Sequence, residues 1–173
     1  MHAHSIAVEL DYQLALSDEQ SRSVVLPSEQ QVQTWIQAVL ATLEYDSDVQ
    51  VTVRIVDDAE MTDLNQTYRH KNGATNVLSF PFELPQGMPE DEARSLFGGM
   101  LGDIVVCASV VQNEAAAQQK PVLQHWAHMI IHGVLHLLGH DHIAAGDAEQ
   151  MEGIEVQVLK SLGIGNPYLA SDA

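Results

Sequence analysis

Histidines are concentrated in one short segment of this chain. Six of the nine histidines fall between positions 125 and 142, in the sequence HWAHMIIHGVLHLLGHDH. A single histidine on an apolar helix is usually a hydrogen-bonded core residue. Several histidines at regular spacing instead predict a metal centre, because imidazole nitrogen is a common ligand of zinc and other transition metals.

Three of these histidines have the spacing of a complete metal-binding set. His132 and His136 lie four residues apart, so on a helix their imidazoles project from the same face about one turn apart. Gly139 favours the left-handed backbone conformation that ends a helix, and the chain can then bring His142 back to the same ion. Three neutral imidazoles leave a fourth position for water, whose pKa falls to about 7 on zinc. The pattern therefore predicts a catalytic rather than a structural metal site.

The remaining histidines are weaker candidates. His132 and His140 would lie about 12 Å apart along a straight helix, whereas two nitrogens on one ion are at most about 4 Å apart. His128, one turn before His132, is predicted to line the pocket or to hydrogen-bond a ligand. His125 is a weaker candidate than His128, and His2 and His4 are expected to be solvated, whereas for His70 contact with RNA and exposure to solvent both stay open.

The same spacing occurs in a class of zinc proteases. Metzincin proteases carry the pattern HExxHxxGxxH, in which the glutamate after the first histidine is the general base. Here that position is Gly133, which has no side chain to transfer a proton, so peptide hydrolysis is an alternative rather than the main hypothesis. Asp141 could orient His142 or replace a histidine ligand, and a two-histidine, one-carboxylate iron site is a further alternative.

Hydrophobic periodicity predicts the elements that must position these residues. Alternating apolar and polar residues predict strands, and apolar residues three or four apart predict helices. The expected strands cover residues 6–14, 49–55, 76–82 and 100–110, the last buried on both faces. The expected helices cover residues 28–43, 59–68, 109–119, 122–138 and 147–162, with Ser28 and Gln31 as a capping box and Asp57-Asp58 as a turn and cap. Residues 83–99 are expected to form a surface loop, and the tail after about residue 167 is expected to fray.

Length and charge restrict the functions open to the chain. It has 173 residues, enough for one domain with its own hydrophobic core, and a formal net charge of −17. Because broad nucleic-acid binding requires many lysines and arginines on phosphates, any RNA must be recognised locally, and no DNA partner is expected. Cys107 is the single cysteine, which excludes an intramolecular disulfide and a cysteine-rich zinc module. Without a basic leader or a long apolar run, we expect a cytoplasmic protein that does not enter a membrane.

Three blocks of sequence resemble the YbeY family, endoribonucleases of ribosomal RNA maturation. Residues 132–142, HGVLHLLGHDH, resemble its signature HGxLHLxGxDH. Residues 64–82, LNQTYRHKNGATNVLSFPF, resemble its segment LNxxYRxKxxxTxVLSFP, and residues 101–107, LGDIVVC, resemble a third block. The family's acidic-Lys-Pro stretch is replaced here by Asn72-Gly73-Ala74.

This resemblance implies a fold, a cofactor and an activity. The implied fold is a single α+β domain over residues 1–173, with a mixed sheet of about four strands packed with helices and a zincin-like metal helix. The implied cofactor is one Zn²⁺ on His132, His136 and His142, and Arg69 takes the position of the family's functional arginine. The implied activity is single-strand-selective cleavage of ribosomal RNA in ribosome maturation and small-subunit quality control. The implied partners are the small ribosomal subunit, its proteins and an assembly GTPase.

Charge distribution independently favours a phosphate-binding role for Arg69. Arg69 and Lys71 are two of only seven basic residues, and the segment between Leu64 and Phe82 contains no acidic residue. A planar guanidinium can hold two phosphate oxygens and stabilise charge that develops at phosphorus. The alternative is that Arg69 only pairs with a nearby carboxylate. For Asp103, a hydrogen bond that supports the site and a purely structural one are both open.

Metal-assisted cleavage of RNA is therefore the main hypothesis. The ion would activate water or polarise a phosphate oxygen, while Arg69 holds the phosphate. The sequence identifies no general base, and either water or the RNA 2′-hydroxyl can be the nucleophile. Two other classes stay open, a non-catalytic ribosome-assembly factor with a structural metal and a metalloprotease without the usual glutamate. The acidic surface suits basic ribosomal proteins as partners of an assembly factor.

Overall fold

The computed structural model describes residues 6–140 and 145–169. Within these ranges the chain combines strands and helices in an α+β fold, as the sequence predicts. The elements in chain order are β1 (Val8–Leu14), α1 (Asp18–Arg22), α2 (Glu29–Thr42), β2 (Val49–Val56), α3 (Asp58–Arg69), β3 (Val77–Pro81), α4 (Glu90–Phe97), β4 (Met100–Cys107), α5 (Ala108–Ala117), α6 (Val122–Leu137) and α7 (Ala145–Ser161).

The strands form one four-stranded sheet in the order β1-β2-β4-β3. β1 and β4 pair with β2 in parallel, whereas β3 pairs with β4 antiparallel. Val53 shows the register at the centre, since it pairs with Tyr12 of β1 and with Ile104 of β4. The sheet is therefore mixed, as predicted, and β3 lies at one edge of it.

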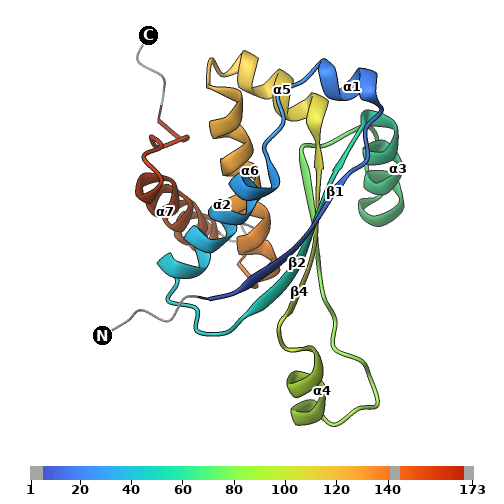
Figure 1. Cartoon of the computed structure of the whole chain (residues 1–173), viewed down its shortest axis with the longest axis vertical. Coiled ribbons are helices and arrows are strands. Elements are labelled where there is room, and N and C mark those ends of the chain that lie inside the picture. Colours follow the sequence, from blue (N-terminus) through green and yellow to red (C-terminus); the bar gives the residue numbers. More distant parts are fainter. Residues whose placement is uncertain (1–5, 141–144, 170–173) are drawn as a thin grey trace.

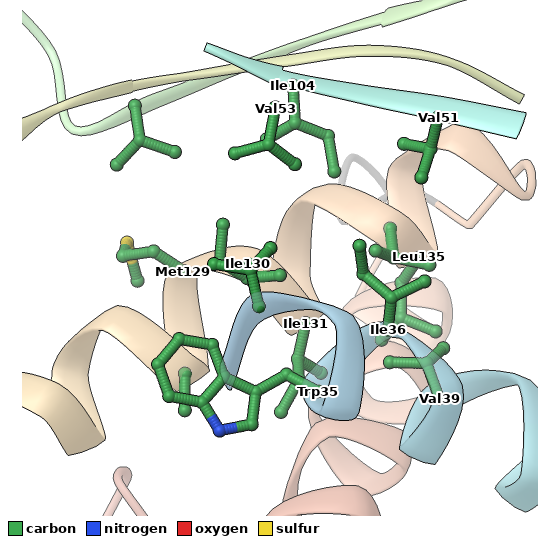
Figure 2. Close-up of a cluster of buried hydrophobic side chains, with 14 of the residues drawn as sticks. Trp35, Ile36, Val39, Val51, Val53, Ile104, Met129, Ile130, Ile131 and Leu135 are labelled. Atoms are coloured by element: carbon green, nitrogen blue, oxygen red, sulfur yellow. The ribbon is translucent and has the colours of Figure 1, made fainter. Parts of the chain in front are cut away.

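Three helices, α2, α6 and α7, lie on the same side of the sheet in Figure 1. Alternate residues of β2 point to this side and are buried, namely Val49, Val51, Val53 and Ile55. Figure 2 shows this layer, in which Val53 and Ile104 of the sheet face Ile130 of α6. Burying one such side chain stabilises the fold by about 1.5–3 kcal/mol. This packing fixes α6, the helix that carries His132 and His136, against the sheet.

The other face of the sheet is covered only in part, by α3. A second cluster of buried residues lies there and consists of Val56, Met61, Leu78, Val105 and Cys107. Burial raises the pKa of the Cys107 thiol, so this cysteine is a packing residue rather than a nucleophile. Asp57 caps α3, as predicted, by accepting a hydrogen bond of 2.9 Å from the Glu60 amide. The Asp57 cap sets where α3 begins, and His70, in a left-handed conformation, ends the helix after Arg69.

Capping boxes begin two of the helices. The predicted box at α2 is confirmed, since Ser28 and Gln31 each accept the other's backbone amide. α1 was not predicted, although Ser17 and Gln20 form the same box at its start. Because α1 has only five residues and none of them is buried, it carries no apolar periodicity that could indicate a helix.

The prediction of a loop over residues 83–99 is wrong in its second half, where α4 forms. The first turn of α4 is acidic, which stabilises a helix N-terminus, and Arg94 pairs with Glu90 at 2.9 Å one turn away. Ala93 is buried and anchors the helix. The prolines and glycines that suggested a loop lie outside α4, before Glu90 and after Phe97.

Two further expectations also need correction. β4 is not buried on both faces along its whole length, because Met100 and Asp103 are exposed where α3 does not reach, and it ends at Cys107. Fraying after residue 167 is not observed at Tyr168, whose hydroxyl hydrogen-bonds to the carboxylate of Glu155. Residues 170–173 of the tail lie outside the described ranges.

The end of α6 follows the prediction made from Gly139. The helix ends at Leu137, and Gly139 adopts a left-handed conformation with a φ of +96°. The amide of His140 then donates to the Leu135 carbonyl at 3.0 Å, which closes the last turn. Among residues 6–140 and 145–169, no helix combines the length and the apolar character needed to cross a membrane.

Candidate metal centre

The two helical histidines of the predicted ligand set are brought together by α6. His132 and His136 lie on adjacent turns, with their Nε2 atoms 3.1 Å apart and their ring centroids 4.6 Å apart. Two nitrogens that bind one tetrahedral zinc ion, each about 2.1 Å from it, lie about 3.4 Å apart. The pair therefore presents its Nε2 atoms at a separation that fits one shared ion.

A buried carboxylate contacts the far side of the first of these rings. Glu155 of α7 is fully buried, and its Oε2 lies 3.0 Å from Nδ1 of His132. Burial alone would raise the pKa of Glu155, but hydrogen bonds from His128, His132 and Tyr168 outweigh it and lower this pKa to about 2. Glu155 is therefore ionised at neutral pH.

Two further side chains hold the other oxygen of this carboxylate. Nε2 of His128 lies 3.0 Å from Oε1 of Glu155 and 3.1 Å from the Tyr168 hydroxyl, which itself donates to Oε1. Burial, and then the neighbouring carboxylate, raises the pKa of Tyr168, so this hydroxyl stays protonated. His128 was expected to line the pocket or to bind a ligand. It is buried instead, its ring lies edge-on to that of His132 with centroids 6.5 Å apart, and Glu155 hydrogen-bonds to both rings.

A second histidine–carboxylate pair joins α6 to α5, two turns before His132. His125 is buried, and its Nε2 lies 3.0 Å from Oε1 of Glu114 on α5. Burial lowers the pKa of His125, although Glu114 opposes this shift, so His125 is neutral at physiological pH. The Nδ1 atoms of His125 and His128 are buried and have no hydrogen-bond partner among the residues that the structure describes.

A cavity of about 320 Å³ joins the histidine pair to Arg69. Arg69, the last residue of α3, lines this cavity together with His132, His136 and the edge strand β3. Strand β3 is held against α6 by Ser79, whose hydroxyl donates to the Gly133 carbonyl at 3.2 Å. Arg69 is exposed and forms no ion pair with any residue in the described ranges. The expected alternative, a carboxylate partner for Arg69, is therefore not found there.

The third predicted ligand, His142, and the neighbouring Asp141 lie outside the described residues. Among the residues that are described, no group of three histidine, cysteine, aspartate or glutamate side chains is arranged to hold a metal ion. His140 is therefore not part of such a group with His132 and His136. Completion of the site by His142 stays a prediction from the spacing around Gly139.

Other residues that the sequence left open are not among those that line the cavity beside the histidine pair. Asp103 is exposed on the wall of a different cavity, of about 620 Å³, on the open face of the sheet. His70 ends α3 in a left-handed conformation with a φ of 55°. The loop that contains Asn72-Gly73-Ala74 is held by Asn65, whose side-chain amide donates to the Gly73 carbonyl at 2.9 Å.

Gly133 lies on the side of α6 that packs against Ile104 of the sheet. A Cβ atom built at this position would approach Cγ2 of Ile104 to 2.9 Å, closer than real Cβ contacts. The position therefore points into the core, and a glutamate there would be a buried, unpaired charge rather than a general base in the cavity.

We expect Gly133→Glu to destabilise the fold without creating a protease. The free energy of unfolding should fall by about 3 kcal/mol or more, since a charge is buried in a packed contact. Urea denaturation measures this loss, and an unstructured protein substrate tests for peptide hydrolysis. Gly153→Glu is the matched control, because Gly153 is an exposed helical glycine with open space around it, and this change should not destabilise. A variant at position 133 with wild-type stability, or one that cleaves protein, would contradict this expectation.

Sequence reasoning missed Glu155 as part of the site. Its sequence signal is a single acidic residue on the apolar face of α7, four residues after Met151 and four before Leu159, both of which are buried. The link to His132 spans 23 residues and depends on how α7 packs on α6, which no local pattern encodes.

Comparison with known proteins identifies the fold and the family of this chain. The solution structure of TM1509 from Thermotoga maritima has a TM-score of 0.52 to this chain at 22% sequence identity, and the similarity covers 90% of this chain and 91% of that one. At this identity the likeness shows the fold alone. The family model described as endoribonuclease YbeY matches residues 15–163, which is most of the sequence. The chain therefore belongs to the YbeY endoribonuclease family.

Proposed function

We propose that this protein is a zinc-dependent, single-strand-selective endoribonuclease that acts in ribosomal RNA processing. The family is one of metal-dependent endoribonucleases, which supports hydrolysis of RNA in general terms. The observation that carries the specific proposal is the cavity that combines an arginine without an ion pair in the described ranges, Arg69, with the histidine pair of α6. One end of the cavity can receive a phosphate and the other can hold an ion.

In this proposal His132 and His136, together with His142, hold one Zn²⁺. The bound ion would supply Lewis acidity and lower the pKa of water in the cavity. Arg69 would hold two oxygens of the scissile phosphate and stabilise the negative charge that develops there. Asp141, whose position is not described, is not given a role.

The charge of the chain supports local recognition of RNA. With a net charge of −17, an extended nucleic-acid backbone would be repelled along most of the surface. The acid-free segment from Leu64 to Phe82 supplies Arg69, Lys71 and much of the lining of the cavity. A flexible single strand can bring one phosphate to this region more easily than a stiff duplex can.

The proposed setting is maturation and quality control of the small ribosomal subunit in the cytoplasm. The acidic surface suits contact with basic ribosomal proteins, and an assembly GTPase is a further proposed partner. These partners and this location follow from the family resemblance and from charge.

The experiment that tests this proposal compares one RNA in two states. A single-stranded fragment of ribosomal RNA and the same fragment annealed to its complement are incubated with zinc-loaded protein and with chelator-treated protein. We expect cleavage of the single strand only, and only by the zinc-loaded protein. End-group analysis of the products then separates attack by water from attack by the 2′-hydroxyl. If the protein holds stoichiometric zinc but leaves both RNAs intact, the nuclease proposal fails and an assembly factor with a structural metal is favoured.

A further inference from the structure

Glu155 is a fully buried acidic residue on an otherwise apolar helix face. It lies where α7 packs on α6, and its neighbours on that face are buried hydrophobic residues, namely Met151, Val158 and Leu159. A carboxylate in such a place is strongly unfavourable unless it is hydrogen-bonded on both oxygens. The contacts of Glu155 therefore have to explain why a charge is kept there.

These contacts bind both oxygens and leave the carboxylate a single orientation. Oε1 receives His128 and the Tyr168 hydroxyl, and Oε2 lies 3.0 Å from Nδ1 of His132. Oε1 already accepts the proton of the Tyr168 hydroxyl, so Oε2 is left to accept a hydrogen bond from Nδ1 of His132, and a ring that carries one proton then holds it on Nδ1. The lone pair is then on Nε2, the atom that lies 3.1 Å from Nε2 of His136.

We propose that Glu155 is a positioning residue that fixes His132 in the tautomer and orientation in which Nε2 binds the metal ion. This inference rests on the proposed metal site, and it assigns Glu155 no contact with the ion or the RNA. His128 and Tyr168 contribute indirectly, since they keep Oε1 in place and so prevent the carboxylate from turning away from His132. Outer hydrogen bonds of this kind orient histidine ligands and make them more basic.

The alternative is that Glu155 only joins α7 to α6 as a structural ion pair. Both roles predict that loss of the charge disturbs packing, so stability alone does not separate them. They differ in the metal affinity of the folded protein, and the chain contains a matched pair for this comparison. Glu114 of α5 lies at the same distance, 3.0 Å, from His125, which is on the same helix as His132, and the hydrogen-bond partners of its carboxylate in the described ranges are His125 and Asn76 rather than His132.

The test measures zinc affinity by competition with a chromophoric chelator, in the absence of RNA. We expect Glu155→Gln to weaken zinc binding by about 10–100-fold, as loss of an outer-shell partner typically does. Glu114→Gln should leave the affinity unchanged. Tyr168→Phe should weaken it less than Glu155→Gln, because the carboxylate still reaches His132. A folded Glu155→Gln protein with the affinity of the wild type would overturn the inference.

A second measurement needs no variant. Nitrogen-15 NMR of the metal-free wild-type protein, in alkaline buffer, reports which nitrogen of His132 carries the proton. We expect the Nδ1–H tautomer, and the Nε2–H tautomer would overturn the inference even if Glu155→Gln fails to fold. The two proposals also fail separately. If the wild type binds zinc but does not cleave RNA, the proposed function fails and the role of Glu155 still stands. If Glu155→Gln binds zinc with wild-type affinity, the role of Glu155 fails and the proposed function still stands.

Discussion

Replacing His136 with alanine will abolish stoichiometric zinc binding and RNA cleavage together. His132 and His136 present their Nε2 atoms 3.1 Å apart, and a single imidazole cannot replace the chelate that the two rings form. The loss of affinity should exceed the roughly 10–100-fold that removal of an outer-shell partner costs. Zinc content after dialysis and cleavage of a single-stranded RNA measure the two effects on one sample.

The matched control for this variant is His140→Ala. His140 lies in the turn after α6 and belongs to no group of three metal-binding side chains within the described part of the chain. It should keep both zinc and activity. If His136→Ala retains one equivalent of zinc, or cleaves RNA at the wild-type rate, the assignment of His136 as a ligand is wrong.

Replacing Arg69 with alanine will lower turnover and leave zinc in place. Arg69 lines the same cavity as the histidine pair but forms no ion pair in the described ranges, so its removal breaks no internal contact of that kind. Loss of one group that stabilises developing charge typically costs about 100–1,000-fold in turnover. Single-turnover cleavage rates at saturating RNA measure this loss, and zinc content is measured in parallel.

Two other variants separate a specific role of Arg69 from a general effect of charge. Arg94→Ala removes an exposed arginine that pairs with Glu90 on α4, outside the cavity, and should cleave normally. Arg69→Lys keeps the charge but loses the two-pronged guanidinium, so it should recover only part of the rate. Equal rates for Arg69→Ala and the wild type would refute a phosphate-binding role.

The fold was predictable where the local pattern agrees with the packing. Val51 and Val53 alternate with polar residues in β2, and Ser28 begins α2 with a capping box, so both elements could be recognised from short segments. α4 was missed because the prolines and glycines around it dominate the composition, while the signal of the helix itself is its acidic first turn. α1 was missed because a five-residue helix without a buried side chain has no period.

The site residues, too, were predictable where the signal is local and not where it depends on tertiary packing. His132 and His136 could be identified because two ligands four apart on one helix are a local feature. Arg69 required the family resemblance and the charge distribution, because α3 and α6 are far apart in the sequence and their residues line one cavity only in the folded chain. Glu155 could not be identified, because its contact with His132 arises from the packing of two helices and is not encoded in either helix alone.

The most direct test of the central claim is a zinc reconstitution of the stripped protein. Increasing zinc is added to metal-free protein, and bound zinc and the initial rate of single-stranded RNA cleavage are measured on the same samples. We predict that the rate rises in proportion to bound zinc and stops rising at one equivalent. A rate that does not depend on bound zinc, or a full equivalent of zinc without cleavage, would contradict the assignment of this cavity as a zinc-dependent ribonuclease site.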